Sequence, residues 1–175
     1  GFAGLGLDAS HSLGRVGGGL QLTSALQLEA AVTDASSRPG YARGMVQLAL
    51  THSVGGYGSV LQLSGGSSRG ALPPQRLWYL GGTRTLSGLS FGTAGGDAFW
   101  LARAEVGRGK PLFRPVVFAD LGWAGARASW RRGYRPLSDV GVGLRALDGL
   151  VRVDLARGLF PVSRTRVSLS LERRF

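Results

Sequence analysis

Apolar and polar residues alternate with a period of two along most of this chain, and this pattern limits which secondary structure it can form. Residues 18–33 are the longest example: one set of alternate positions holds Leu20, Leu22, Leu26, Leu28, Ala30 and Val32. The positions between them hold Gln21, Thr23, Gln27, Glu29 and Thr33. An amphipathic helix needs apolar residues at three- and four-residue spacing, which this segment lacks. The pattern therefore predicts a long β-strand with one apolar and one polar face.

The same alternation recurs in nine segments. We predict strands over residues 2–10, 18–33, 42–53, 57–66, 97–107, 113–123, 139–147, 150–158 and 165–175. The last has Val167, Leu169 and Leu171 on one face and ends at the aromatic Phe175. A terminal strand of about 9–11 residues with this pattern is typical of a transmembrane β-barrel.

The connections between these segments alternate between short and long. Residues 67–96 and 124–138 are long, whereas 54–56 and 108–112 are short. Long loops on one side and tight turns on the other are the layout of bacterial outer-membrane barrels. We therefore expect an all-β, transmembrane antiparallel β-barrel in the outer membrane, with residues 1–175 in one membrane domain and the C-terminus on the periplasmic side.

The polar faces carry repeated glycines and charges of both signs, which suits a crowded, water-filled lumen. In the alternative, a soluble β-sandwich, the apolar faces would form an internal core and the polar faces would meet water. No stretch approaches 18 consecutive apolar residues, so the sequence predicts no transmembrane helix.

The formal net charge is +11, and all basic residues except Lys110 are arginines. They form no single basic run and accompany no nucleic-acid-binding motif, so we expect no nucleic-acid partner. Outer-membrane lipid and lipopolysaccharide are the expected partners, because guanidinium groups bind phosphate bidentately. Arg127, Arg131, Arg132 and Arg135 crowd one predicted loop, where they either meet lipopolysaccharide phosphates or are simply solvated.

No arrangement of residues predicts catalysis. The segment Gly88-Leu89-Ser90-Phe91-Gly92 fits the G-x-S-x-G pattern of serine hydrolases, but that motif needs a following helix and a later histidine. Both histidines, His11 and His52, come earlier in the chain. The scattered carboxylates and two distant histidines form no metal set. We therefore expect no enzyme activity, no catalytic residue, no metal and no cofactor.

Several blocks, in order, resemble the C-terminal barrel region of the BamA/TamA superfamily, the bacterial surface antigen family of outer-membrane assembly and translocation proteins. They are 80–82 with 85–89, 117–122, 140–145, 151–156 and the C-terminal strand, which resembles the β-signal of the family. The resemblance implies that the nine segments are the last strands of a barrel of about sixteen. It also implies that earlier strands and periplasmic domains belong to a longer protein.

In this family the long loop, here residues 67–96, folds into the lumen. The resemblance places Gly81, Gly82 and Gly88 in that loop, and Glu105 and Asp120 as acidic partners on the next two strands. Family members carry arginine where this chain has Ser87. Our hypothesis is that Arg84, three residues upstream, pairs with these acids instead; the alternative is that Arg84 is solvated in the loop.

The resemblance implies an outer-membrane barrel of a protein-assembly or translocation factor that inserts or exports client proteins. Its partners would be client outer-membrane or secreted proteins and other assembly-complex subunits. The alternative is a passive outer-membrane pore, or the membrane anchor of a surface or phospholipase-type protein. Repeated periplasmic domains in the full-length protein would indicate assembly, and a hydrolase domain would indicate an anchor.

Overall fold

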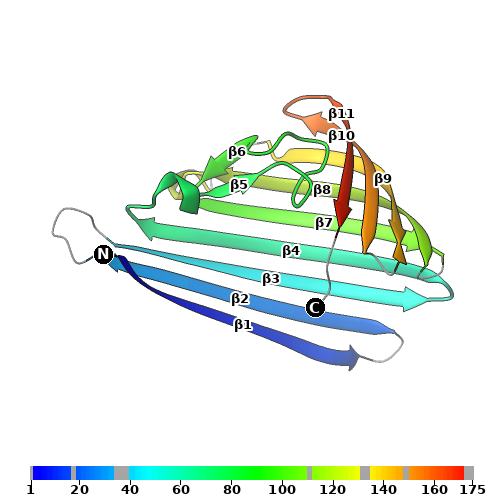
Figure 1. Ribbon diagram of the computed structural model, residues 1–175, viewed down its shortest axis with the longest axis horizontal. Coiled ribbons are helices and arrows are strands. Elements are labelled where there is room, and N and C mark those ends of the chain that lie inside the picture. The colour runs from blue at the N-terminus through cyan, green and yellow to red at the C-terminus, as the bar shows by residue number, and fades with distance from the viewer. Residues whose placement is uncertain are drawn as a thin grey trace.

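The computed structural model describes residues 2–16, 19–33, 40–109, 112–130, 135–147 and 150–171. Nine long strands form one antiparallel sheet in which each strand pairs with the next (Figure 1). They are β1 (Phe2–Val16), β2 (Leu20–Thr33), β3 (Tyr41–Val54), β4 (Tyr57–Gly70), β7 (Ala98–Arg108), β8 (Phe113–Gly125), β9 (Leu137–Ala146), β10 (Val151–Phe160) and β11 (Thr165–Leu171). The nine predicted strands are confirmed within the described residues.

Two strands run further than the alternation predicted. β1 continues to Val16 rather than residue 10, and β4 continues to Gly70 rather than residue 66. Ser12 stands opposite Thr23, and Ser67 stands opposite Ala98. Backbone pairing therefore extends these strands beyond the point where alternation marks them, because ladder hydrogen bonds do not depend on side-chain polarity.

The segment between β4 and β7, predicted as a loop, contains structure of its own. It holds a short 3-10 helix, η1 (Pro74–Arg76), and a hairpin of β5 (Trp78–Leu80) with β6 (Ala94–Gly96). A second 3-10 helix, η2 (Arg127–Ser129), follows β8. Among the described residues, no helix is long and apolar enough to cross a membrane.

The sheet has a concave and a convex face, and Figure 1 shows β5 and β6 lying inside its curve. Residues 78–89, which we call the covering segment, lie against the concave face and form the apolar core of the structure with β7–β9. We call the strands of the sheet beneath this segment the wall. Leu86 in this core is completely buried. The core members are Trp78, Leu80, Leu86, Leu89, Phe99, Ala124 and Leu137.

The convex face carries the alternating leucines and valines, and these side chains are exposed. Leu22, Leu50 and Leu61 stand opposite one another across β2, β3 and β4. Leu50 and Leu61 are exposed, and so are Val117, Val142 and Leu155 on β8, β9 and β10. The apolar faces are therefore not the core of this fold.

Two further features orient the sheet. At one edge are the strand ends joined by 34–40, 71–97 and 126–136, each of seven residues or more, and by 161–164, which has four. At the other edge are the strand ends joined by 17–19, 55–56, 109–112 and 147–150, each of two to four residues. We call these two sets of strand ends the long-connection edge and the short-connection edge. Within the described residues, β1 pairs only with β2 and β11 only with β10, so the nine strands form an open, curved sheet.

Candidate functional site

A row of charged residues crosses the concave face beneath the segment 78–89. Arg103 on β7 stands opposite Asp120 on β8, and Asp120 stands opposite Asp139 on β9. All three lie on the concave face because each occupies a polar position of its strand's alternation. Side chains directly opposite each other on antiparallel strands are close enough to interact, so the register itself assembles the row.

Arg103 and Asp120 form a bidentate ion pair. Arg103 Nε donates to Asp120 Oδ1 at 2.8 Å, and Arg103 Nη2 donates to Asp120 Oδ2 at 2.9 Å. The Asp120 side chain has no exposed surface and that of Arg103 is 16% exposed. Arg103 Nη2 also donates to the carbonyl oxygen of Thr85 at 2.5 Å, so the same guanidinium connects the wall to the covering segment.

Asp139 makes a second connection to the covering segment. The backbone N–H of Gly88 donates to Asp139 Oδ2 at 2.5 Å, and both residues are buried. Gly88 packs so closely against the wall that a Cβ there would lie 2.5 Å from Gly158 N and 2.7 Å from Arg157 C on β10. Only glycine fits at this contact without moving the segment or the strand.

The turn that presents Gly88 depends on two earlier glycines with positive φ. Gly81 has φ 108° and donates its N–H to Thr85 Oγ1 at 2.9 Å. Gly82 has φ 93° and donates its N–H to the carbonyl oxygens of Leu86 and Leu89 at 3.0 Å. Glycine adopts this region of φ without steric cost, so these two positions set the fold of the covering segment.

A second charge cluster lies next to the row, toward the short-connection edge. Glu105 on β7 is paired with Arg145 on β9 at 2.8 Å and with Arg152 on β10 at 2.7 Å. Arg152 also pairs with Asp154 at 2.6 Å, and its guanidinium carbon lies 5.3 Å from the ring centre of Phe118. Buried charges need such partners because isolated ions are costly to desolvate.

These contacts correct the predicted partner of the two acids. Arg84 was expected to pair with Glu105 and Asp120, but it is exposed and forms no ion pair with any described residue. The cation beside Asp120 comes from Arg103 on the wall, and Glu105 is paired by Arg145 and Arg152. Ser87 is buried, and its Oγ has no hydrogen-bond partner among the described residues.

The covering segment is also attached at its two ends. Near its start, Arg76 Nη1 lies 3.2 Å from Glu29 Oε1 on β2. The guanidinium of Arg43 on β3 lies 3.9 Å from the ring centre of Trp78. On the far side, Arg166 on β11 donates to Ser90 Oγ at 2.8 Å. The segment is thus connected to β2, β3, β7, β9 and β11.

The remaining predicted site residues lie in other places. Val167, Leu169 and Leu171 of β11 point away from the concave face and are exposed, whereas Phe175 lies outside the described residues. Arg131 and Arg132 also lie outside them. Arg127 is exposed in η2, and Arg135 lies over the ring of Phe160, 4.6 Å from its centre.

The sequence analysis missed Arg103, Asp139, Arg145 and Arg152 as parts of this site. Because Arg103 lies two residues before Glu105, the alternation places both side chains on the same face of the strand, but it does not identify a partner for Arg103. A signal for it existed: the short connection 109–112 fixes the β7–β8 register, which places Arg103 opposite Asp120. No pattern of side chains in the sequence could have identified Asp139, because its partner in the covering segment is a backbone N–H.

Comparisons with known proteins show a likeness at the level of the fold. No family model matches the sequence, and no curated protein matches it. Among solved structures, the fold is similar to that of CdiB from Acinetobacter baumannii, with a TM-score of 0.48 and 16% sequence identity. The match covers 96% of this chain and 41% of that one, so the chain spans about two fifths of the length of CdiB.

Proposed function

We propose that this chain is the C-terminal part of an outer-membrane β-barrel that inserts or exports client proteins. The single observation that carries the membrane assignment is the inverted polarity of the sheet. Charged residues such as Asp120 and Glu105 are buried on the concave face, while leucines and valines cover the convex face. Leu5 is 84% exposed and Leu169 is 68% exposed.

Exposed apolar surface on this scale needs a nonaqueous environment. Monomeric soluble proteins rarely expose contiguous apolar patches larger than a few hundred Å². Burying each Leu or Val side chain is worth about 1.5–3 kcal/mol, so hydrocarbon contact would stabilise the convex face across all nine strands. The concave face would then line the lumen, and residues 71–97, which connect β4 to β7, would fold into it.

Strand length supports the same assignment. β7 has 11 residues and β9 and β10 have 10 each. A strand of about 9–11 residues crosses the hydrocarbon core when tilted by about 45°. The short-connection edge would face the periplasm, because bacterial barrels have short periplasmic turns and longer extracellular loops.

The edge at β11 is where client handling and a passive pore would differ. The described part of β11 has seven residues, and only β10 pairs with it among the described residues. Its backbone groups on the other side need partners in hydrocarbon, because unsatisfied groups there cost several kcal/mol each. Such an edge pairs either with an earlier strand of the same protein or with an incoming strand of a client.

Disulfide trapping in liposomes tests this proposal. The chain contains no cysteine, so Ser168→Cys on β11 introduces one defined thiol into it. The matched control is Ser64→Cys on β4, which faces the same side and is paired on both edges, with β3 and β7. The probe is a small outer-membrane barrel protein with one cysteine in its last strand, supplied unfolded to the full-length protein.

We expect a disulfide between the probe and position 168, none with position 64, and faster folding of the probe than in empty liposomes. Steady ion conductance without a disulfide at position 168 and without faster folding would instead indicate the passive pore or anchor. A full-length protein that leaves the membrane fraction in buffer without detergent would contradict the membrane assignment itself.

A further inference from the structure

A groove of about 810 Å³ lies at the long-connection edge, chiefly on the convex face, and the charged row of Arg103, Asp120 and Asp139 does not line it. Two cross-strand rows form its floor. One row is Leu5, Ala30, Ala42 and Arg69, and the other is Leu7, Leu28, Gly44 and Ser67. We call this hollow the rim groove; Arg127 of η2 lines one end of it.

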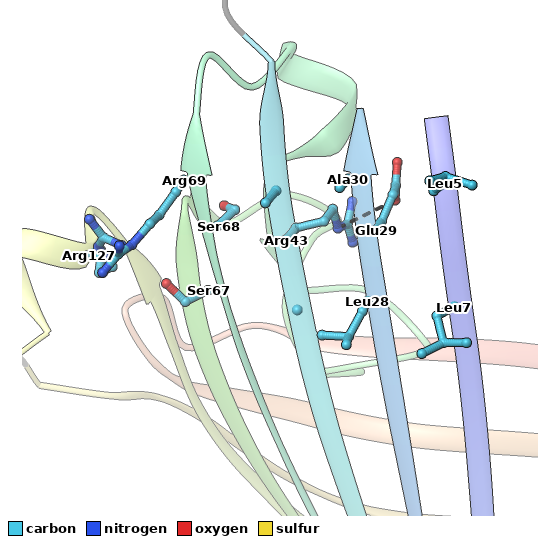
Figure 2. A pocket seen from close by; sticks show the side chains of 12 residues that line it. Leu5, Leu7, Leu28, Glu29, Ala30, Arg43, Ser67, Ser68, Arg69 and Arg127 are labelled. Atoms are coloured by element: carbon cyan, nitrogen blue, oxygen red, sulfur yellow. Dashed lines mark ion pairs between the residues drawn. The ribbon is translucent and has the colours of Figure 1, made fainter. Parts of the chain in front are cut away.

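Side-chain size explains the shape of the rim groove. Ala30, Ala42, Gly44 and Ser67 are small, whereas the leucines on β1 and β2 are large and exposed. Figure 2 shows Leu5, Leu7 and Leu28 on one side of the groove and Arg69 and Arg127 on the other. One side of the groove is therefore apolar, and the opposite side carries two guanidinium groups.

The two arginines differ from those of the concave face because their guanidinium groups have no acidic partner in the described part of the chain. Arg43 and Arg76 pair with Glu29, and Arg103 pairs with Asp120. The guanidinium groups of Arg69 and Arg127 form no ion pair or hydrogen bond with any described residue. Asp97 accepts the backbone N–H of Arg127 at 2.5 Å, which holds the start of η2 beside the groove.

Two tryptophans indicate at which level of the membrane the groove lies. Val46, Gly65, Trp100 and Trp123 stand in register on β3, β4, β7 and β8, and Trp123 contacts Trp130 edge to face at 5.6 Å. Tryptophans are enriched at the level of lipid headgroups. Arg69 lies four residues beyond Gly65 on β4, about 13 Å along the strand toward the long-connection edge. Arg69 thus lies outside the hydrocarbon, on the headgroup side of the aromatic level.

We infer that the rim groove binds a phosphorylated lipid of the outer leaflet, with phosphate on Arg69 and Arg127 and acyl chain against the leucines. The inference rests on the proposed membrane location. Charge complementarity supports this occupant, because arginine pairs bidentately with phosphate. Among the described residues that line the groove, the one carboxylate is that of Glu29. The carboxylate of Asp97, near the arginine end, accepts the backbone N–H of Arg127. Glu29, at the other end, already has Arg43 and Arg76 beside it.

The test compares lipid binding to variants of the full-length protein in nonionic detergent. The probes are lipid A, a phosphorylated glycolipid, and the same lipid after enzymatic removal of its phosphates. Arg69→Ala/Arg127→Ala removes the cations, and Ala42→Phe fills the groove while keeping both cations. Arg108→Ala is the matched control, because Arg108 is exposed at the short-connection edge, where it stacks on Tyr57 at 4.9 Å.

We expect the double variant to bind lipid A at least about tenfold more weakly, because its hydrogen bonds to the phosphates are lost. Binding of the dephosphorylated lipid should not change. Ala42→Phe should weaken binding of both lipids, and Arg108→Ala of neither. Equal lipid A binding by the double variant and Arg108→Ala, no phosphate preference in the unmodified protein, or a polypeptide in the groove would overturn the inference. Fractionation of washed membranes tests the membrane location separately. If only the lipid-binding inference is wrong, the full-length protein stays in the membrane fraction; if the membrane location is wrong, it does not.

Discussion

Replacing Arg103 with methionine removes the cation that serves both the wall and the covering segment. Three hydrogen bonds are lost, two to the Asp120 carboxylate and one to the Thr85 carbonyl oxygen. Methionine keeps much of the apolar length of the side chain, so packing changes little. What remains is a fully buried carboxylate at Asp120 that stands directly opposite the carboxylate of Asp139.

The expected loss of stability follows from the burial of Asp120. Removing one partner of a buried ion pair costs about 3–5 kcal/mol, because the other charge stays buried without compensation. Arg103 itself is only 16% exposed, so solvent screens the pair weakly. We therefore expect Arg103→Met to lower the free energy of unfolding by about 3–5 kcal/mol. Combining it with Asp120→Asn should recover most of the loss, because the stranded charge is gone.

The measurement is equilibrium urea unfolding of the full-length protein in detergent micelles, with the heat-induced gel shift of the folded barrel as a second readout. Arg84→Ala is the matched control: it removes an exposed arginine of the covering segment and should change the free energy by no more than about 0.5 kcal/mol. If Arg103→Met were as silent as Arg84→Ala, the assignment of the Asp120 cation to the wall would be refuted.

Three further changes test other contacts of the fold. Gly88→Ala should detach the covering segment, because its new Cβ would lie 2.5 Å from Gly158 N; faster proteolysis of residues 78–89 in the folded protein would report this. Ser87→Ala should leave the urea midpoint unchanged or raise it slightly, since it removes a buried hydroxyl without a described partner; a marked decrease would reveal a partner. Leu48→Arg on the convex face should cost about 2–4 kcal/mol in folding into lipid, whereas Gln47→Arg on the concave face should cost far less, as measured by unfolding from liposomes.

The sequence predicted the strands and their faces because both follow from a period of two. Leu26 and Leu28 were assigned to the apolar face of their strand, and the structure exposes both on the convex side. Alternation does not say which residues stand opposite each other on neighbouring strands. The pair of Arg103 with Asp120 depends on that register, so it could be inferred only by aligning β7 and β8 across their short connection.

The covering segment was harder to predict for a different reason. Its hydrogen bonds to the charged row are made by backbone groups, Gly88 N–H and the Thr85 carbonyl, which nearly every residue possesses. Sequence patterns mark side chains, so they directed attention to Arg84 as the missing cation. The rim groove was equally hidden, since it arises from small residues on three strands, β2, β3 and β4, that come together only through the register.

The position of the cation affects how the covering segment can leave the wall. If the arginine belonged to the segment, displacement would strand Asp120 as a buried charge, at a cost of about 3–5 kcal/mol. With Arg103 on β7, Asp120 keeps its partner when the segment moves, and only the hydrogen bonds of Gly88 and Thr85 are lost on the charged row. The main resistance then comes from exposing the buried side chains of Leu86 and Leu89, about 1.5–3 kcal/mol each. The attachment is therefore chiefly apolar, and it depends less on salt than an ion pair between segment and wall would.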